Sequence, residues 1–531
     1  MNDTELPEFG LISDQIRHHA TLAPQRLALL CGADRQSYAE LDRSMDRVAA
    51  SLQRDGLRPG DSIAICAAAS VAYAVMFLGA LRAGVVVAPL APGSTAASLA
   101  RMVADAGARL VFVDHATAGE FASTGAAPSH TAPLFLQLDD HEAPGAHRCL
   151  RDWLAPEGAT PTEVRIDASA PFNIIYSSGT TGEPKGIVQP HGMRWSHVRR
   201  ARAYDYGPQT ITLLATPLYS NTTLVVFFPT LAFGGTVAMM PKFDASAYLK
   251  LAEELRVTHT MLVPVQYQRL MANAGFDRHD LRSFQMKFST SAPFGAALKA
   301  DVLARWPGGL IEFYGMTEGG GTCILEAHRH PDKLHTVGQP AEGHDIRLID
   351  ESGREAEAGT AGEVVGHSGG MMSGYHGQPD KTREAEWFAP DGKRFIRTGD
   401  VGRFDDDGFL VLSDRKKDMI ISGGFNIYPS DLEAQFRLHP AIAEVAVIGV
   451  PSEQWGETPV AFVVLQPDVA ESADELLAWF NRQVGKTQRL AAVKRVTELP
   501  RSAIGKVLKR ELRVAYTADP QGGAVPSGRG A

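Results

Sequence analysis

The sequence has 531 residues, a formal net charge of −9, 44% hydrophobic residues and 21% charged residues. These values are typical of a globular protein of roughly two to four domains. The mild acidity argues against a general nucleic-acid-binding protein, which usually carries a basic stripe. The four cysteines lie far apart and form no CxxC pair, which argues against a disulfide scaffold and a zinc site. We therefore expect a protein of a reducing compartment, the cytoplasm.

The N-terminal residues, MNDTELPEFG, include acidic side chains and lack the basic-then-apolar order of a signal peptide. Residues 62–81 contain no charged side chain and are long enough to span a bilayer. Their internal pattern, SIAIC, then AAAS, then an apolar helical run followed by VVVAPLAP, instead favours a buried strand–helix–strand unit. We therefore expect no transmembrane span, and keep one as the less favoured alternative.

Residues 11–115 alternate helical and strand patterns, such as a helix for YAELDRSMDRVAASLQRDG and a strand for RLVFVD. Residues 116–170 are rich in Ala, Pro, Gly and His, and predict a surface connection. The short strand FNIIY, at 172–176, then precedes a second alternating block at about 195–320. Strands that alternate with helices indicate mainly parallel sheets covered by helices.

Shorter, turn-rich strands between 335 and 412 predict a small antiparallel β-barrel or sheet, and residues 418–513 read as β-β-α-β-β-α. The predicted fold class is therefore α/β. A large N-terminal domain, residues 1–414, would contain two packed, covered, mainly parallel sheets and the small β-barrel. A small α+β domain, residues 415–518, would follow, and then a disordered tail, residues 519–531.

Ser430 and Glu433 have the spacing of a capping box, which predicts a helix that begins at Asp431. Three histidines in HRHPDKLH, His328, His330 and His335, fit no standard zinc spacing. A solvated loop is the favoured interpretation of that cluster.

The stretch YSSGTTGEPKG, residues 176–186, leaves the strand FNIIY with three glycines, several hydroxyls and one lysine. A bare backbone can wrap phosphate oxygens with its N–H groups, and Lys185 adds a positive charge. Only two residues separate Gly179 from Gly182, whereas the Walker loop requires four between its glycines. The composition alone leaves an anion-binding loop and a flexible surface loop equally open.

Four further motifs follow in order: FYGMTEGG, IRTGD, DRKKDMIISGGFN and LPRSAIGKVLKREL. Together with the SSGTTGEPKG loop, they resemble the adenylate-forming superfamily of acyl-CoA synthetases, peptide-synthetase adenylation domains and luciferases. The resemblance covers about residues 11–513 and is closest in style to aryl- or acyl-acid CoA ligases such as 4-coumarate–CoA ligase. Each motif alone would be weak evidence, but the ordered set is specific.

The resemblance implies an ATP site. Thr317 would contact the α-phosphate, Glu318 would hold Mg²⁺, Asp400 would bind the ribose hydroxyls, and Arg415 would be a second contact to the ribose or to a phosphate. A carboxylate beside a triphosphate is repulsive unless a hard cation lies between them, which supports the role of Glu318. The residues implied for the triphosphate are Ser177, Ser178, Gly179, Thr180, Thr181, Gly182 and Lys185. Those implied for the adenine slot are Ser291, Ala292, Pro293, Glu312, Phe313, Tyr314 and Gly315.

The same resemblance implies a two-step reaction in which the small C-terminal domain is mobile. A carboxylate attacks ATP to give an acyl-adenylate and pyrophosphate, and a thiol then displaces AMP. Lys506 would stabilise the charge that develops in the first step, and Lys417 would be the hinge residue. Coenzyme A would approach Gly423 and Gly424, and Trp455 either contacts its nucleotide or is a half-buried structural side chain.

The acid pocket departs from the common pattern of the family. Ser220 stands where a histidine is common, Phe313 stands where hydroxycinnamate ligases usually have glycine, and no acidic residue occupies the position that binds an α-amine. An uncharged aryl or acyl acid is therefore favoured over an amino acid, with a medium-chain fatty acid as an alternative. The expected pocket residues, besides Ser291 and Phe313, are Tyr219, Ser220, Thr222, Gly319 and Gly321.

Two other functions stay open at this point. A stand-alone adenylation enzyme could load a carrier protein in trans, because no carrier domain follows Lys506. A non-catalytic nucleotide-binding protein is less favoured, because Lys185, Glu318, Asp400 and Lys506 are retained together. A homodimer is possible.

Overall fold

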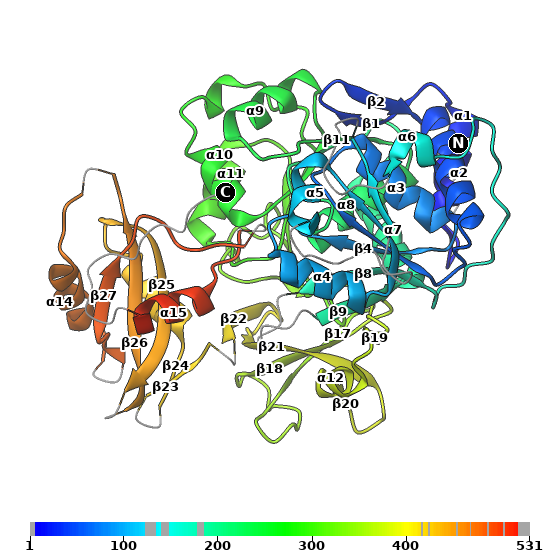
Figure 1. Cartoon of the computed structure of the whole chain (residues 1–531). Helices are drawn as coiled ribbons and strands as arrows, with labels where there is room; N and C mark the ends of the chain where they lie inside the picture. The colour runs from blue at the N-terminus through cyan, green and yellow to red at the C-terminus, as the bar shows by residue number, and fades with distance from the viewer. Residues whose placement is uncertain are drawn as a thin grey trace. The chain divides into compact units, whose positions relative to one another are not determined.

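The computed structural model (Figure 1) describes residues 6–122, 134–139, 148–177, 185–415, 418–422, 425–452, 455–467, 469–485, 488–502 and 505–518. The chain divides into two compact units. The first contains the residues up to 346 together with 365–397, and the second contains 347–364 and the residues from 398 onward. The domain boundary expected after residue 414 stays a prediction.

The first large sheet contains the strand–helix–strand unit that was expected at residues 62–90. Strands β3 (Ser62–Cys66) and β4 (Val86–Leu90) pair in parallel on either side of α3 (Val71–Arg82). The Ser70 hydroxyl caps α3 by accepting a hydrogen bond from the backbone N–H of Tyr73. The buried alternative is therefore confirmed, and none of the helices in the described ranges is long and apolar enough to cross a bilayer.

This sheet has eight strands in the order β19-β9-β8-β4-β3-β5-β6-β7. The pairs from β8 to β7 are parallel, whereas β8, β9 and β19 pair in antiparallel fashion. Its remaining strands are β5 (Ala108–Val113), β6 (Leu134–Gln137), β7 (Arg148–Cys149), β8 (Pro171–Ser177), β9 (Lys185–Pro190) and β19 (Gly374–Tyr375). The strand expected at FNIIY is β8.

The second large sheet has nine strands in the order β16-β15-β14-β13-β12-β10-β11-β1-β2. The run from β1 to β14 is parallel, and antiparallel strands extend both edges. The strands are β1 (Leu27–Cys31), β2 (Asp34–Ser37), β10 (Ile211–Leu214), β11 (Thr236–Met239), β12 (His259–Leu262), β13 (Met286–Ser289), β14 (Gly309–Tyr314), β15 (Cys323–Glu326) and β16 (Gln339–Pro340). Two mainly parallel sheets are thus confirmed.

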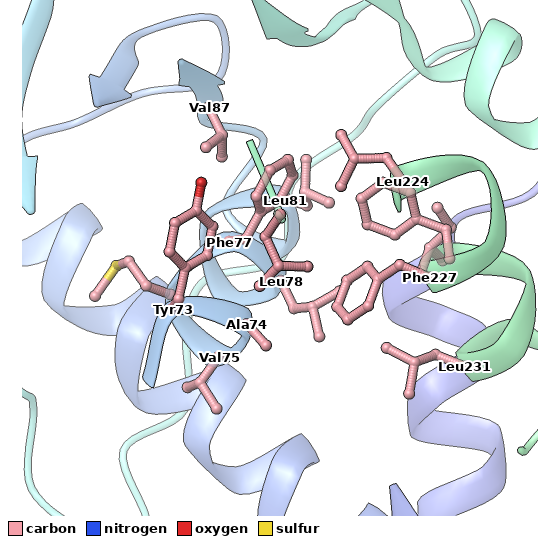
Figure 2. Packing of buried hydrophobic residues seen from close by; sticks show 14 of the residues in the cluster. Tyr73, Ala74, Val75, Phe77, Leu78, Leu81, Val87, Leu224, Phe227 and Leu231 are labelled. Carbon is pink, nitrogen blue, oxygen red and sulfur yellow. The ribbon is translucent and has the colours of Figure 1, made fainter. Parts of the chain in front are cut away.

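The helices of the first unit are α1 (Ile12–Leu22), α2 (Tyr38–Arg54), α3, α4 (Ala96–Asp105), α5 (His115–Ala122), α6 (Leu150–Trp153), α7 (His191–Ala201), α8 (Asn221–Ala232), α9 (Ala245–Glu254), α10 (Pro264–Met271), α11 (Ala296–Arg305) and α12 (Pro379–Glu384). Two of them, α3 from the first sheet and α8 from the second, are apolar on nearly every side and share one core. Figure 2 shows Phe77 and Leu81 of α3 facing Leu224 and Phe227 of α8. A helix that is apolar all round must be covered all round, so this pair ties the two sheets together.

The small β-barrel expected between 335 and 412 is instead a five-stranded sheet with the open order β17-β18-β21-β20, in which β22 also pairs with β21. Its strands are β17 (Asp345–Ile349), β18 (Gly362–His367), β20 (Glu386–Phe388), β21 (Arg394–Phe404) and β22 (Leu410–Arg415). The pairings of β21 with β20 and with β22 are antiparallel.

The C-terminal part is α+β, as expected, and contains one strand and one helix beyond the predicted pattern. Its elements are β23 (Ile420–Ser422), β24 (Phe425–Ile427), α13 (Pro429–Phe436), β25 (Ile442–Ser452), β26 (Gly456–Leu465), α14 (Ala473–Gln483), β27 (Ala492–Arg495) and α15 (Lys509–Ala518). Side chains alternate along β25, so that Val447 packs with α13 and α14, and Ile448 packs with α15.

The predicted capping box at Ser430 is wrong. Helix α13 begins at Pro429, and its N-cap residue, Tyr428, makes no side-chain cap. The Ser430 hydroxyl instead donates to the backbone carbonyl of Ser413, and the Glu433 carboxylate accepts from the backbone N–H of Val447. Both side chains therefore form hydrogen bonds with distant residues, and not the local capping bonds that the sequence pattern predicted.

Candidate active site

The glycine-rich stretch joins two strands that pair with each other. Strands β8 and β9 are antiparallel, with Tyr176 opposite Gly186 and Ser177 opposite Lys185. The two ends of the stretch are therefore held side by side, and Lys185 is the first residue of β9. Residues 178–184, which include the candidates Ser178, Gly179, Thr180, Thr181 and Gly182, lie outside the described residues.

Two candidate side chains, Lys185 and Glu318, meet the unpredicted side chain of Tyr375 beside the end of this hairpin. Strand β19 pairs with β9 and places Tyr375 opposite Ile187. The Lys185 ammonium nitrogen lies 5.1 Å from the centroid of the Tyr375 ring. The Tyr375 hydroxyl donates a hydrogen bond of 2.9 Å to Oε1 of Glu318. Tyr375 thus joins the candidate phosphate-binding lysine to the candidate magnesium ligand.

Burial and the neighbouring Glu318 carboxylate both raise the pKa of Tyr375 above its ordinary value. The phenol therefore stays protonated and remains a donor to Glu318 throughout the physiological pH range. Among the described residues, Tyr375 is the side-chain partner of Oε1, and the second carboxylate oxygen of Glu318 can accept another ligand. A carboxylate with one ordered oxygen fits Mg²⁺, which is commonly held by one or two carboxylates and by substrate phosphates.

The glycines after Glu318 are required by close backbone packing. Gly319 has a φ of +77° and pairs with Met371, and a Cβ on it would lie 2.1 Å from the carbonyl oxygen of Gly370. A Cβ on Gly321 would lie 1.8 Å from the side chain of Ile346. Only glycine fits such distances. These two residues, expected to line an acid pocket, therefore pack against neighbouring backbone and side chains, and they hold Glu318 in place.

A buried polar network supports the backbone of Thr317. The Gln189 amide nitrogen donates a hydrogen bond of 2.6 Å to the carbonyl oxygen of Thr317, and its Oε1 accepts hydrogen bonds from Asn173 and Arg194. Arg194 also donates to Oδ1 of Asn173 at 3.1 Å. Burial lowers the pKa of Arg194 to about 9. A guanidinium in this position is stabilised by the amide oxygens that it contacts, and it fixes the orientation of Gln189 in turn.

The segment expected beside the adenine starts with a strained residue. Ser291 has a φ of +80°, and its hydroxyl lies 2.6 Å from that of Thr222, with which it shares a hydrogen bond. Non-glycine residues with positive φ are costly and concentrate at functional sites. Ala292 and Pro293 follow directly, at the carboxyl end of β13. The strained turn therefore brings the predicted adenine segment to the predicted acid-pocket residue Thr222.

Ser220 has a local structural role where the family commonly has histidine. Its hydroxyl caps α8 and accepts a hydrogen bond of 3.3 Å from the backbone N–H of Thr222. Ser220 is buried, and its neighbour Tyr219 is half-buried, with its pKa raised by burial. The residue that replaces the histidine thus orients the helix that carries Thr222.

The strand β14 carries three of the expected adenine contacts, and its side chains point in different directions. Glu312 is buried and forms an ion pair with Lys299; burial raises the pKa of Glu312 to about 7, opposed by that lysine. The side chain of Glu312 is therefore engaged in the core, and its backbone lies between the paired strands β13 and β15. Phe313 stacks on Phe288, with ring centroids 5.6 Å apart. Tyr314 and Gly315, at the end of the strand, are less buried.

The second unit carries the other candidates. Asp400 and Arg415 are opposite each other on the paired strands β21 and β22. Lys506 ends a tight turn: its carbonyl oxygen accepts from the backbone N–H of Ser502, and Gly505 has a φ of +76°. Trp455 is 51% exposed, and both alternatives for it stay predictions. The remaining candidates, Lys417, Gly423 and Gly424, lie outside the described residues.

Comparison with known proteins identifies the family. Residues 16–376 match the AMP-binding enzyme family, and residues 431–506 match the AMP-binding enzyme C-terminal domain. The first match alone covers more than half of the chain. The chain therefore belongs to the AMP-binding enzymes, the adenylate-forming ligases, and the superfamily expected from the motifs is confirmed.

The chain is 34% identical over 509 residues to a feruloyl-CoA synthase from Amycolatopsis sp, and the aligned residues cover 95% of this chain and 98% of that protein. It is 30% identical to the fatty acid–[acyl-carrier-protein] ligase ScoC from Streptomyces coeruleorubidus, with 97% and 98% covered. The ATP-bound MatB structure from Rhodopseudomonas palustris has a TM-score of 0.84 at 30% identity, with 95% and 99% covered. The chain therefore activates an acid as an adenylate, while the acyl acceptors named for the two similar ligases differ: coenzyme A for one and an acyl-carrier protein for the other.

Three functional candidates were missed by reasoning from the sequence: Tyr375, Gln189 and Arg194. Their only signals were the short GY pair after a glycine-rich stretch and the single polar residue Gln189 in the apolar strand pattern GIVQP, while Arg194 lies in a helix rich in basic residues and has no signal of its own. Neither pattern shows which residue each side chain contacts, because the partners are between 5 and 128 positions away.

Proposed function

We propose that this chain is an AMP-forming acid–CoA ligase that acts on an aryl acid. The observation that carries the proposal is the arrangement of Lys185, Tyr375 and Glu318 beside the end of the β8–β9 hairpin. It combines an anion-binding cation with a carboxylate that is held by a hydrogen bond and keeps one oxygen available. Those are the groups that a triphosphate and its cation require.

In the first step, a carboxylate oxygen of the acid forms a bond to the α-phosphorus of ATP, and the bond to pyrophosphate breaks. Lys185 and the loop before it hold the outgoing phosphates, and Thr317 contacts the α-phosphate. Glu318 would hold Mg²⁺, which supplies charge neutralisation when bound. Lys506 supplies positive charge to the reacting oxygens, a form of electrostatic stabilisation that is worth most in a water-excluded site.

In the second step, the sulfur of coenzyme A attacks the acyl carbon, AMP leaves, and the thiol proton passes to solvent. Asp400 and Arg415 bind the ribose of the nucleotide. Gly423 and Gly424 leave room for the pantetheine arm, and exposed Trp455 offers a flat face to the nucleotide of coenzyme A. Lys417 acts as the hinge between the two steps, in a mobile C-terminal domain of residues 415–518.

An aryl acid is favoured by the aromatic surroundings of Phe313 and by the likeness to a feruloyl-CoA synthase. A second candidate, loading of a carrier protein, is favoured by the likeness to an acyl-carrier-protein ligase over 97% of the chain. Both candidates share the first step, and they differ only in the thiol that receives the acyl group.

The test is to supply ATP, Mg²⁺ and a panel of aryl and fatty acids, with either coenzyme A or a phosphopantetheinylated carrier protein, and to measure AMP and the thioester product. We expect AMP and an acyl-CoA product with an aryl acid. Thioester formed only on the carrier would favour the second candidate. Release of ADP in place of AMP, or AMP formation that does not depend on any acid, would exclude both.

A further inference from the structure

A small, partly open cavity is lined by Phe313. It has a volume of about 20 Å³, which is room for about one water-sized group. Its walls come from α7, the turn after it, α8, β13 and β14. The aromatic side is built by Phe313, Phe288 and Tyr204, with ring centroids 5.3 to 5.8 Å apart. Since α8 begins at the candidate pocket residues Ser220 and Thr222, this cavity lies about one turn further along the same helix, at Val225 and Val226.

A guanidinium faces this cavity without an acidic partner. Arg200, near the end of α7, lies with its guanidinium carbon 5.4 Å from the centroid of the Phe313 ring. Within the described part of the chain, no Asp or Glu forms an ion pair with Arg200. The ionisable groups that influence it are Tyr204, His197 and His344, which provide no negative charge at neutral pH. Arg200 is half-buried, and a partly desolvated cation is favoured by a nearby anion, because water compensates only part of its lost hydration.

A second polar atom in the cavity wall is also available. Nδ1 of His197 is buried and has no hydrogen-bond partner among the described residues. Burial and the nearby Arg200 hold the pKa of His197 far below its ordinary value, so the ring is neutral and one of its nitrogens is a donor. His344 is also neutral, because burial and Arg200 lower its pKa to about 4. The cavity wall therefore offers one fixed cation and an unused imidazole nitrogen, and no fixed anion.

From this arrangement we infer that the acid substrate carries a second carboxylate at its far end, which pairs with Arg200. The inference rests on the proposed function and deepens it: an aromatic body packs against Phe313 and Phe288, and one oxygen of the remote carboxylate occupies the water-sized cavity. The reacting carboxylate lies at the other end, toward Thr317, which follows Phe313 by four positions. A charge-assisted contact with guanidinium is stronger than one with a neutral hydroxyl, so a hydroxylated monoacid would use the same cavity less well.

A purely structural role for Arg200 is the competing explanation, because a cation in the last turn of a helix is stabilised by the helix dipole. The experiment supplies the unmodified protein with four cinnamic acids that differ only in the para substituent. This substituent is a carboxylate, the methyl ester of that carboxylate, a hydroxyl or hydrogen. Arg200→Met removes the guanidinium, and Arg200→Lys keeps the positive charge without the paired N–H donors of the guanidinium. Arg199→Met is the matched control, since Arg199 is the exposed neighbour on the same helix.

We expect kcat/KM for AMP release to be about 10-fold or more higher with the diacid than with its methyl ester. Arg200→Met should abolish that preference without lowering the rate with the unsubstituted acid, Arg200→Lys should keep part of it, and Arg199→Met should keep all of it. Equal rates with diacid and ester, or an equal loss for every acid in Arg200→Met, would overturn the inference.

The proposed function and this inference fail in different ways. AMP release with neutral acids only would leave the ligase function standing and reject the second carboxylate. Calorimetric binding of the four acids to the parent and to Arg200→Met gives the same comparison without turnover. A binding preference for the diacid that depends on Arg200 would support the pocket even if no AMP were released, and an absent preference would reject it.

Discussion

The hydroxyl of Tyr375 donates a 2.9 Å hydrogen bond to Glu318, 57 positions earlier in the chain. The same ring lies 5.1 Å from the ammonium group of Lys185. A single aromatic side chain therefore couples the two groups of opposite charge that we assign to the triphosphate and its cation. This coupling gives the first prediction.

Tyr375→Phe removes the hydroxyl and keeps the ring beside Lys185. Without its donor, Glu318 is held less firmly, and hydrogen bonds to charged groups contribute about 1.5–3 kcal/mol. We expect kcat/KM for ATP to fall roughly 10-fold at limiting Mg²⁺, with a higher Mg²⁺ concentration for half-maximal activity. Pyrophosphate release measured against free Mg²⁺ checks this. Tyr248→Phe, which removes a buried hydroxyl that donates to Thr260, is the control, and an unchanged Mg²⁺ dependence in Tyr375→Phe would contradict the assignment.

Gln189→Leu removes the donor to the Thr317 carbonyl and leaves Arg194 with fewer acceptors. Nη1 of Arg194 already has no partner among the described residues. Leaving a buried polar or charged group unsatisfied costs about 1–3 kcal/mol or more, so we expect a loss of that size in the free energy of unfolding. Pairing this variant with Arg194→Met in a double-mutant cycle measures the coupling, which should be about 1–3 kcal/mol. Additive effects of the two substitutions would show that the network is not cooperative.

Lys506→Ala tests the charge that we assign to the first step. By analogy with loss of one preorganised donor, we expect the rate of acid-dependent pyrophosphate exchange to fall about 10²- to 10³-fold. Lys509→Ala is the comparison, because Lys509 is engaged 2.9 Å from Glu433 and should affect stability more than exchange. Exchange at the parent rate in Lys506→Ala would remove that lysine from the mechanism.

The lowered pKa of buried His191 makes the stability of the protein depend on pH. Burial lowers its pKa from 6.5 to about 4, whereas in the unfolded chain the ring protonates near its ordinary value. Stability from this residue is therefore complete above pH 6.5 and is lost as the pH falls toward 4, by up to about 3 kcal/mol. His191→Leu should flatten the fall in the free energy of unfolding between pH 7 and pH 4.5. If chemical denaturation shows the same slope for parent and variant, His191 does not contribute it.

Much of the fold follows from local patterns. The apolar run at residues 62–90 contained its own turn residues, so the choice between a membrane span and a buried strand–helix–strand unit could be made from spacing alone. The ordered motifs, in turn, identified the family before any contact was known. Both successes rest on information that lies within a few consecutive residues.

The failures have the opposite character. Ser430 and Glu433 matched a capping box, yet Ser413 and Val447 compete for them from distant strands. Gln189 and Tyr375 had only weak local signals, because their partners, Thr317 and Glu318, are 128 and 57 positions away in the sequence. A side chain's partner in a folded sheet depends on strand order, which a single sequence does not display.

The pairing of β8 with β9 limits which insertions and deletions the hairpin can tolerate. Because side chains alternate between the two faces of a strand, sliding β9 by one residue against β8 would turn Lys185 to the opposite side of the sheet. Its ammonium group would then leave the ring of Tyr375. An insertion or deletion is therefore harmless to the lysine only if the connecting segment itself absorbs it.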